Sequence, residues 1–247
     1  MNTELKNKFM HHWKKYFKNA ELPVTFYYSD EVTAEIIVPP AKKWNCLICE
    51  LKKVRKGEDL IFNAEALGCQ GAKRYLGYSE KLRPGFEFFL SYGNEKVEGE
   101  RYKRNPELVQ EMMKHQVQLP VNRKNIVFKR WDKLNEADNP DVVIFFAKPD
   151  VLAGLFTLAN FDQSEPDGVY APFGAGCGSI VHYPYLEKKS VRPRAVIGMF
   201  DPSARPCVPY DTLSFSVPME KFEKMISYME ESFLITKTWT NMMKRLE

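Results

Sequence analysis

Two cysteines of the chain stand among glycines, in residues 174–180 (GAGCGSI) and in residues 67–72 (LGCQGA). Each pattern predicts a tight turn that places a cysteine, Cys177 or Cys69, at the start of a helix. The unpaired N–H groups and partial positive charge of a helix start favour a thiolate and lower the pKa of a thiol. Cys177 and Cys69 are therefore candidate catalytic thiols, the alternative being that each is a small packing residue between helix and sheet.

The glycines around Cys177 also predict a binding site for an anion. Successive N–H groups turned toward a helix start attract a phosphate or a carboxylate whether or not the cysteine is ionised. The residues of this candidate ligand site are Gly174, Gly176, Gly178 and Ser179. If groups of the protein itself accept hydrogen bonds from these N–H groups, the turn is structural.

Asp201 and Arg205 complete the candidate ligand site. They follow a strand expected at residues 194–200, and α/β proteins commonly place binding loops after a strand. Arg205 can hold a phosphate or carboxylate while Asp201 orients its guanidinium group. The alternative is that Asp201 and Arg205 simply pair across a turn.

A third candidate site is the pair Cys46 and Cys49, whose spacing places both thiols on one face of a helix. Such a pair can hold a metal ion or cluster with further ligands from Cys69, Cys177 or Cys207, and we take Cys46, Cys49, Cys69 and Cys177 as the candidate ligands. Soft thiolates select zinc, copper(I) or an iron–sulfur cluster. The alternative is two core thiols, because the segment around them is strongly apolar and free cysteines are often buried.

The elements that must position these residues predict an α/β fold, with α+β as the alternative, in which helices flank a twisted mixed sheet. Strands are expected at residues 24–28, 34–38, 60–62, 85–92, 125–128, 141–146, 168–171, 194–200 and 213–217. Helices are expected at residues 5–17, 44–51, 69–76, 105–113, 150–161 and 177–183, and after Pro218. We expect one domain over residues 1–247.

A shift of about 108 positions superposes the expected elements of the two halves of the chain, at residues 20–120 and 121–247. It pairs Gly68 with Gly176 and Cys69 with Cys177. We interpret this match as an internal duplication, with both cysteine-headed helices facing a shared cleft. The alternative is a chance agreement in the order of elements, since few identities support the match.

The composition restricts the class of protein. A net charge of +4, from 36 basic and 32 acidic residues among 247, is too small for a dedicated nucleic-acid binder. The longest apolar run, residues 142–147, is too short to cross a bilayer, and the N-terminus has no signal-peptide pattern. Five cysteines, an odd number, argue against a secreted disulfide framework. We therefore expect a cytoplasmic protein without nucleic-acid or membrane partners.

Short motifs along the chain resemble a known family. They are Cys46 and Cys49 before Lys56-Gly57, residues 69–77 (CQGAKRYLG), residues 174–177 (GAGC), and residues 201–205 (DPSAR) before residues 213–218 (LSFSVP). These motifs, spread from about Val24 to the helix after Pro218, resemble the family catalogued as domain of unknown function 169. The resemblance implies a small cytoplasmic prokaryotic protein with cysteines at these positions, and it implies no particular activity.

Two functions from different classes follow from these residues. The first is a cysteine-centred redox or metal protein, with zinc or an iron–sulfur cluster as the expected cofactor. The second is a non-catalytic binder of a small anionic ligand at the glycine-cysteine helix starts. The sequence contains no phosphate-binding loop, hydrolase elbow or zinc-protease motif, so it leaves open whether the protein is an enzyme.

The apolar C-terminal helix belongs either to the core or to the surface of a homodimer.

Overall fold

A seven-stranded mixed sheet runs through the computed structural model, which describes residues 1–32, 37–119 and 121–246. Its strands are β1 (Val24–Ser29), β2 (Leu60–Phe62), β3 (Asn125–Arg130), β4 (Val142–Ala147), β5 (Val169–Tyr170), β6 (Ala195–Gly198) and β7 (Leu213–Pro218). They lie in the order β2-β3-β1-β4-β7-β6-β5. Neighbouring strands are antiparallel except for β5 and β6, which are parallel. The α/β sheet with flanking helices expected from the sequence is confirmed.

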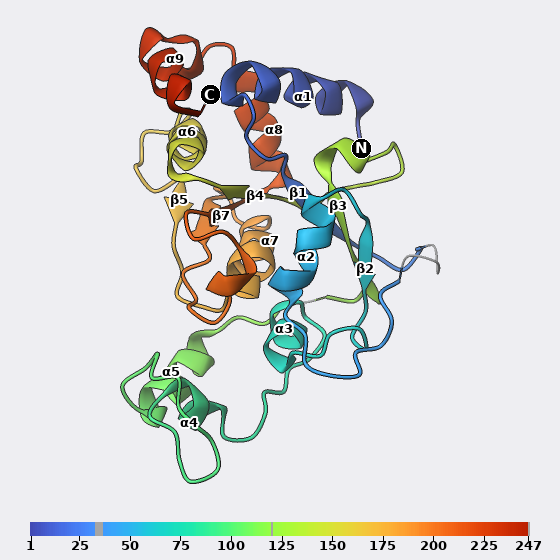
Figure 1. Cartoon of the computed structure of the whole chain (residues 1–247), viewed down its shortest axis with the longest axis vertical. Coiled ribbons are helices and arrows are strands. Elements are labelled where there is room, and N and C mark those ends of the chain that lie inside the picture. The colour runs from blue at the N-terminus through green and yellow to red at the C-terminus, as the bar shows by residue number, and fades with distance from the viewer. Residues whose placement is uncertain (33–36, 120, 247) are drawn as a thin grey trace.

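The helices lie on both faces of this sheet (Figure 1). One face carries α1 (Thr3–Phe17), α6 (Pro149–Ala159), α8 (Met219–Tyr228) and α9 (Lys237–Met243), and the other carries α2 (Leu47–Arg55), α3 (Gln70–Tyr75) and α7 (Tyr183–Glu187). A π-helical turn, η3 (Gly178–His182), leads directly into α7, and short 3₁₀ turns are η2 (Trp131–Lys133), η4 (Arg205–Cys207), η5 (Phe233–Ile235) and η6 (Lys244–Leu246). The helices α4 (Phe86–Leu90) and α5 (Pro106–His115) pack on each other farthest from the sheet.

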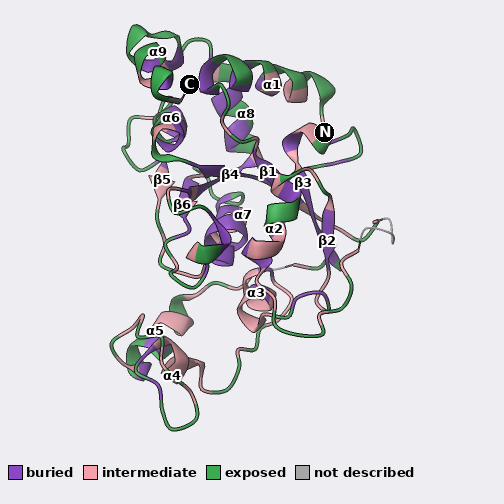
Figure 2. Ribbon diagram, in the orientation of Figure 1, coloured by how far each residue is buried: buried purple, intermediate pink, exposed green. Residues whose placement is uncertain are grey.

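Strand β4 shows why the sheet is covered on both sides. Its six residues are all buried, because Val142, Ile144 and Phe146 belong to the core under α2 while Val143, Phe145 and Ala147 belong to the core under α1 and α8. Side chains alternate between the faces of a strand, so a continuous apolar run is typical of a strand covered twice. Figure 2 shows this buried band across the middle of the molecule.

The C-terminal helices belong to the core, which is one of the two positions that the sequence leaves open for them. Met225 and Ile226 of α8 and Trp239 and Met243 of α9 are buried in the same core as α1. The Trp239 indole N–H donates to the Tyr16 carbonyl group over 2.9 Å, which joins the two ends of the chain. A homodimer stays a prediction.

The strand expected at residues 85–92 is wrong, because residues 86–90 form the helix α4. Gly85 begins it in the left-handed region at φ 77°, and its carbonyl group accepts from the N–H groups of Phe88 and Phe89. Aromatic residues favour strands, but here they belong to a helix that packs on α5, away from the sheet edges. The strand expected at residues 34–38 falls mainly outside the described residues, although Ile37 forms an isolated bridge with Ile61.

The internal duplication is not confirmed. Residues 60–62 and 169–170 form strands at opposite edges of the sheet, as a duplicated unit would. However, the helix α4 stands where the first half needs a counterpart of β6, so the repeated order of elements is interrupted.

We expect Gly154→Ala in α6 to destabilise the protein by roughly 1 to 3 kcal/mol, because the added methyl group is an overpacking change. A Cβ at this position would lie 2.3 Å from Cη2 of Trp239 and 2.9 Å from Cε1 of Phe17. Urea denaturation measures the change.

The matched control is Gly71→Ala in α3, whose added Cβ has only an ordinary contact of 3.7 Å with the Cys69 sulfur. This control should change the free energy of unfolding by less than about 1 kcal/mol, because Gly71 lies in the first turn of α3 and its added methyl group meets no close neighbour. Equal effects of the two variants would contradict the packing described for Gly154.

Candidate cysteine centre

Three cysteines from two distant segments meet beside the N-terminus of α2. The sulfur atoms of Cys46, Cys49 and Cys207 all lie within 4.8 Å of one another, and Cys49 and Cys207, 158 residues apart in sequence, form a disulfide. Cys207 is buried, and Cys46 and Cys49 are half-buried against the same core. This group can hold a metal ion when its thiols are reduced and unpaired.

The helix α2 positions two of these sulfurs. Cys46 is its N-cap residue, in extended conformation, and Cys49 follows one turn later, so both side chains lie on the same side of the helix start. Leu47, Ile48 and Leu51 are buried in the core beneath the sheet and fix the rotation of α2. The Cys46 and Cys49 sulfurs therefore lie close together, as their spacing predicts, although Cys46 precedes the helix.

The position of the third sulfur, that of Cys207, depends on Arg205, which holds the surrounding segment in place. The guanidinium group donates to the carbonyl groups of Thr212, Tyr210 (2.7 Å), Pro209 (3.2 Å) and Met199 (3.4 Å). These bonds close the loop between β6 and β7 around the 3₁₀ turn that ends at Cys207. Arg205 is thus a positioning residue for this loop, and it does not pair with Asp201 among the ion pairs of the described residues.

Asp201 binds the glycine turn to the same loop. Its carboxylate accepts from the Gly176 N–H (3.1 Å), from the Ser203 N–H (3.0 Å) and from the Ser203 hydroxyl (2.7 Å). A helix start favours a negative charge, and here the charge comes from a side chain of the protein. The Gly178 N–H donates to the Ala175 carbonyl group over 2.9 Å. The Ser179 N–H also donates to the Ala175 carbonyl group, over 3.3 Å. The N–H groups of Gly176, Gly178 and Ser179 therefore have partners within the protein. Binding of an external anion by the full set expected from the sequence stays a prediction: Gly174, Gly176, Gly178, Ser179, Asp201 and Arg205.

Close packing around residue 176 leaves no room for a side chain, so this position requires glycine. A Cβ at this position would lie 3.0 Å from the Ala204 Cβ, 3.0 Å from the Met199 sulfur and 3.3 Å from Cγ1 of Ile48. The Ser179 hydroxyl donates to the Gly176 carbonyl group (2.8 Å) and accepts from the Met199 N–H (3.3 Å). The turn therefore brings α2, η3 and the loop after β6 into direct contact.

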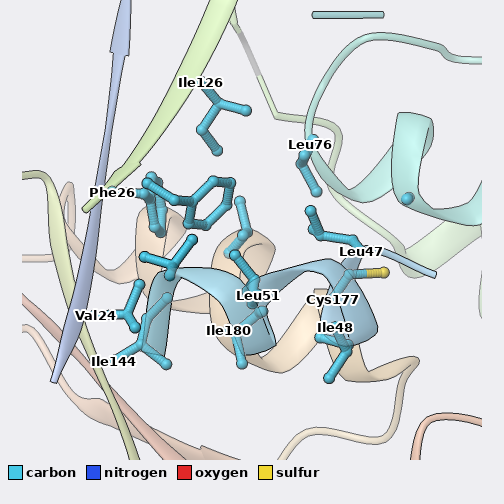
Figure 3. Packing of buried hydrophobic residues seen from close by; sticks show 14 of the residues in the cluster. Val24, Phe26, Leu47, Ile48, Leu51, Leu76, Ile126, Ile144, Cys177 and Ile180 are labelled. Atoms are coloured by element: carbon cyan, nitrogen blue, oxygen red, sulfur yellow. The ribbon is translucent and has the colours of Figure 1, made fainter. Parts of the chain in front are cut away.

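Cys177 lies in the first helical turn after Gly176, as the sequence predicts, but it is buried with only 8% exposure. Burial raises the pKa of its thiol well above the ordinary value, and the nearby Cys69 and Cys46 thiols and the Asp201 carboxylate raise it further. The expected lowering by the helix start is overcome, because desolvation of the charged form is the larger effect. Figure 3 shows Cys177 beside Leu47 and Ile48 of α2.

Cys69 is the N-cap residue of α3 and is half-buried against the same core. Cys69 and Cys177 lie outside the group of three sulfurs that could bind a metal ion. The ligand set expected from the sequence, Cys46, Cys49, Cys69 and Cys177, stays a prediction. From the sequence alone, Cys207 is only one of several possible further ligands. The one feature of the sequence that draws attention to Cys207 is its position just after the loop of residues 201–205. Sequence spacing does not show that this loop folds back onto α2.

The sequence profile of the DUF169 family, described as uncharacterised ArCR, matches residues 14–228 of the 247 residues. The chain belongs to the DUF169 family. The match includes all five cysteines and the segments that hold them, so the resemblance drawn from the short motifs is confirmed. This DUF169 protein has no match among the curated proteins or the solved structures with which it was compared. None of the helices in the described residues combines the length and apolar character needed to span a bilayer.

We expect Cys177 to react with maleimide more slowly at neutral pH than an unperturbed thiol, because its raised pKa leaves less thiolate. The pH profile of its reaction rate should be displaced upward. A variant in which the other four cysteines are serine isolates this thiol, and an unstructured cysteine peptide is the reference. A Cys177 that reacts faster than the peptide at neutral pH would contradict its burial.

Replacing Asp201 with alanine should lower the free energy of unfolding by about 1 to 2 kcal/mol, the usual cost of removing a helix-capping side chain. The variant loses the acceptor of the Gly176 and Ser203 donors. Thermal or urea unfolding measures this loss. Asp162→Ala is the matched control, since Asp162 is exposed and has no hydrogen bond to the described residues. An Asp201 variant as stable as the control would show that the carboxylate does not secure the turn.

Proposed function

We propose that this DUF169 protein uses Cys46, Cys49 and Cys207 as a redox-sensitive metal–thiolate centre. The observation that carries the proposal is the approach of three sulfur atoms to within 4.8 Å of one another from segments 158 residues apart. Thiolates bound to one tetrahedral zinc ion at about 2.3 Å lie roughly 3.8 Å apart, which this grouping accommodates.

The chemistry of three thiolates favours a soft metal ion. Zinc, copper(I) and iron–sulfur clusters are the groups that such ligands select. Three protein ligands leave a fourth position for water or a substrate, whereas structural zinc sites are closed by four protein ligands.

The disulfide between Cys49 and Cys207 supports a second, oxidised state of the same centre. When the reduced centre is oxidised, the two thiolates give up one electron each, a sulfur–sulfur bond forms and the metal ion is released. A peroxide is a suitable oxidant, since hydrogen peroxide takes up the two electrons with two protons and leaves as two water molecules. Cys46 remains a free thiol in this state.

A reducing compartment suits this proposal. Glutathione and thioredoxin keep thiols reduced in the cytoplasm, so the metal-bound state would be the resting state there. Cytoplasmic location is thus part of the proposal. The disulfide is the transient, oxidised form of the cysteine centre. Cys177 lies close enough to Cys69 and Cys46 for them to raise the pKa of its thiol, but neither Cys69 nor Cys177 belongs to the group of three sulfurs.

Metal analysis of protein purified anaerobically with a reductant tests the proposal. We expect about one zinc, copper or iron centre per chain, since three ligands hold a single site. Hydrogen peroxide should release the metal, consume two thiols and yield a peptide cross-linked between Cys49 and Cys207. Both readouts are needed, because metal release alone does not identify the sulfurs involved.

Variants distinguish this centre from the other thiols. Cys46→Ser and Cys207→Ser should each lower the bound metal severalfold, because each removes one of three ligands. Cys69→Ser is the matched control and should retain it, since Cys69 lies outside the group. Reduced protein that cannot be loaded with zinc, copper(I) or iron, or a Cys207→Ser variant that keeps its full metal content, would refute the proposal.

A further inference from the structure

The two bonded cysteines of the centre differ in their access to solvent. Cys207 is only 3% exposed, whereas Cys49 is half-buried in the first turn of α2. The third cysteine of the centre, Cys46, is a half-buried free thiol, and its sulfur lies within 4.8 Å of the sulfurs of both bonded cysteines. The three sulfurs of one group are therefore not equivalent toward a reagent that arrives from solvent.

Oxidation by a peroxide places different demands on the two members of a disulfide. One thiolate first meets the peroxide and becomes a sulfenic acid, and a second thiol then condenses with it. The first step requires exposure, because the oxidant arrives from solvent, while the second step requires only a neighbouring thiol. Of the bonded pair, Cys49 fulfils the first requirement better, and the buried Cys207 fulfils the second.

We propose that Cys49 is the thiol of the reduced centre that a peroxide oxidises, and that Cys207 is the thiol that resolves the product. The Cys49 thiolate attacks one oxygen of hydrogen peroxide, the oxygen–oxygen bond breaks, and Cys49 sulfenic acid and hydroxide form. The Cys207 thiolate then attacks the Cys49 sulfur, the sulfur–oxygen bond breaks, and a second hydroxide leaves. Each hydroxide takes a proton from solvent to give water, so two electrons pass from the two sulfurs to the peroxide.

This inference rests on the proposed redox function of the centre and gives an order to its oxidation. The disulfide between Cys49 and Cys207 is the expected product of the two steps. The steps involve only the sulfurs and the peroxide, so they do not depend on which metal the reduced centre holds. Cys69 and Cys177 have no part in them, since both lie outside the group of three sulfurs.

Cys46 is a second resolving thiol in this scheme. It precedes Cys49 by three residues, and its sulfur lies within 4.8 Å of the Cys49 sulfur without any contribution from the loop that carries Cys207. When Cys207 is absent, Cys46 can therefore attack the Cys49 sulfenic acid in its place. The resulting bond stays within one segment, whereas the bond to Cys207 joins α2 to the loop between β6 and β7.

Trapping of sulfenic acid with dimedone, followed by peptide mass spectrometry, tests the assignment. The reduced full-length protein is freed of metal with a chelator and of reductant, and is then treated with one equivalent of hydrogen peroxide. We expect the wild type to form the bond between Cys49 and Cys207, and Cys207→Ser to form a bond between Cys46 and Cys49. The double variant Cys46→Ser/Cys207→Ser has no resolving thiol in the group, so dimedone should label Cys49.

The matched control is the double variant Cys69→Ser/Cys207→Ser, which keeps Cys46. It should form the bond between Cys46 and Cys49, and dimedone should label its Cys49 severalfold less than in Cys46→Ser/Cys207→Ser. Circular dichroism verifies the fold of each variant. Brief exposure of the wild type to peroxide in excess dimedone provides a measurement without substitutions, in which Cys49 should be labelled before Cys207.

Dimedone found mainly on Cys46 or Cys207, or a folded Cys46→Ser/Cys207→Ser variant without label on Cys49, would overturn the assignment. Equal labelling of Cys49 in the two double variants would overturn the role of Cys46. Each of these results leaves the metal content and the cross-link of the wild type unaffected, so it is distinguishable from failure of the proposed function. A wild type that forms no bond between Cys49 and Cys207 with peroxide would refute both.

Discussion

The missing side chain of Gly176 permits the contact on which the cysteine centre depends. Ile48 of α2, Met199 after β6 and Ala204 in the following loop all approach the space that a Cβ would occupy. Because Cys46 and Cys49 lie at the start of α2 and the loop carries Cys207, this contact holds together the two segments that bring the three sulfurs close. Asp201 secures it by accepting from the Gly176 N–H, and Arg205 secures the loop through four carbonyl groups.

Much of the fold follows from local patterns in the sequence. The apolar run of β4 and the spacing of apolar residues in α1 predict a strand and a helix, and both are present. Residues 86–90 were predicted wrongly because aromatic residues favour a strand only where a sheet partner exists, and here the partner is α5. Local sequence does not reveal which partner a segment meets.

The same limit applies to the candidate site. The spacing of Cys46 and Cys49 was sufficient to predict that their sulfurs lie close together, because helix geometry is local. The approach of Cys207 depends on folding over 158 residues, which no spacing encodes. The glycines around Cys177 were interpreted as room for a ligand. A glycine indicates only that something approaches closely, and at Gly176 the approaching group is a helix of the same chain.

The long separation of Cys49 and Cys207 also changes how the chain is connected. In the oxidised state, the bond between them encloses the chain from α2 to η4, which includes β3, β4 and the protruding helices α4 and α5. In the chain-entropy description, closing a loop of this size restricts the unfolded state by roughly 5 kcal/mol. A backbone cut anywhere inside the loop would leave two fragments still joined covalently. Oxidation would therefore keep a nicked molecule in one piece, and reduction would let the fragments separate.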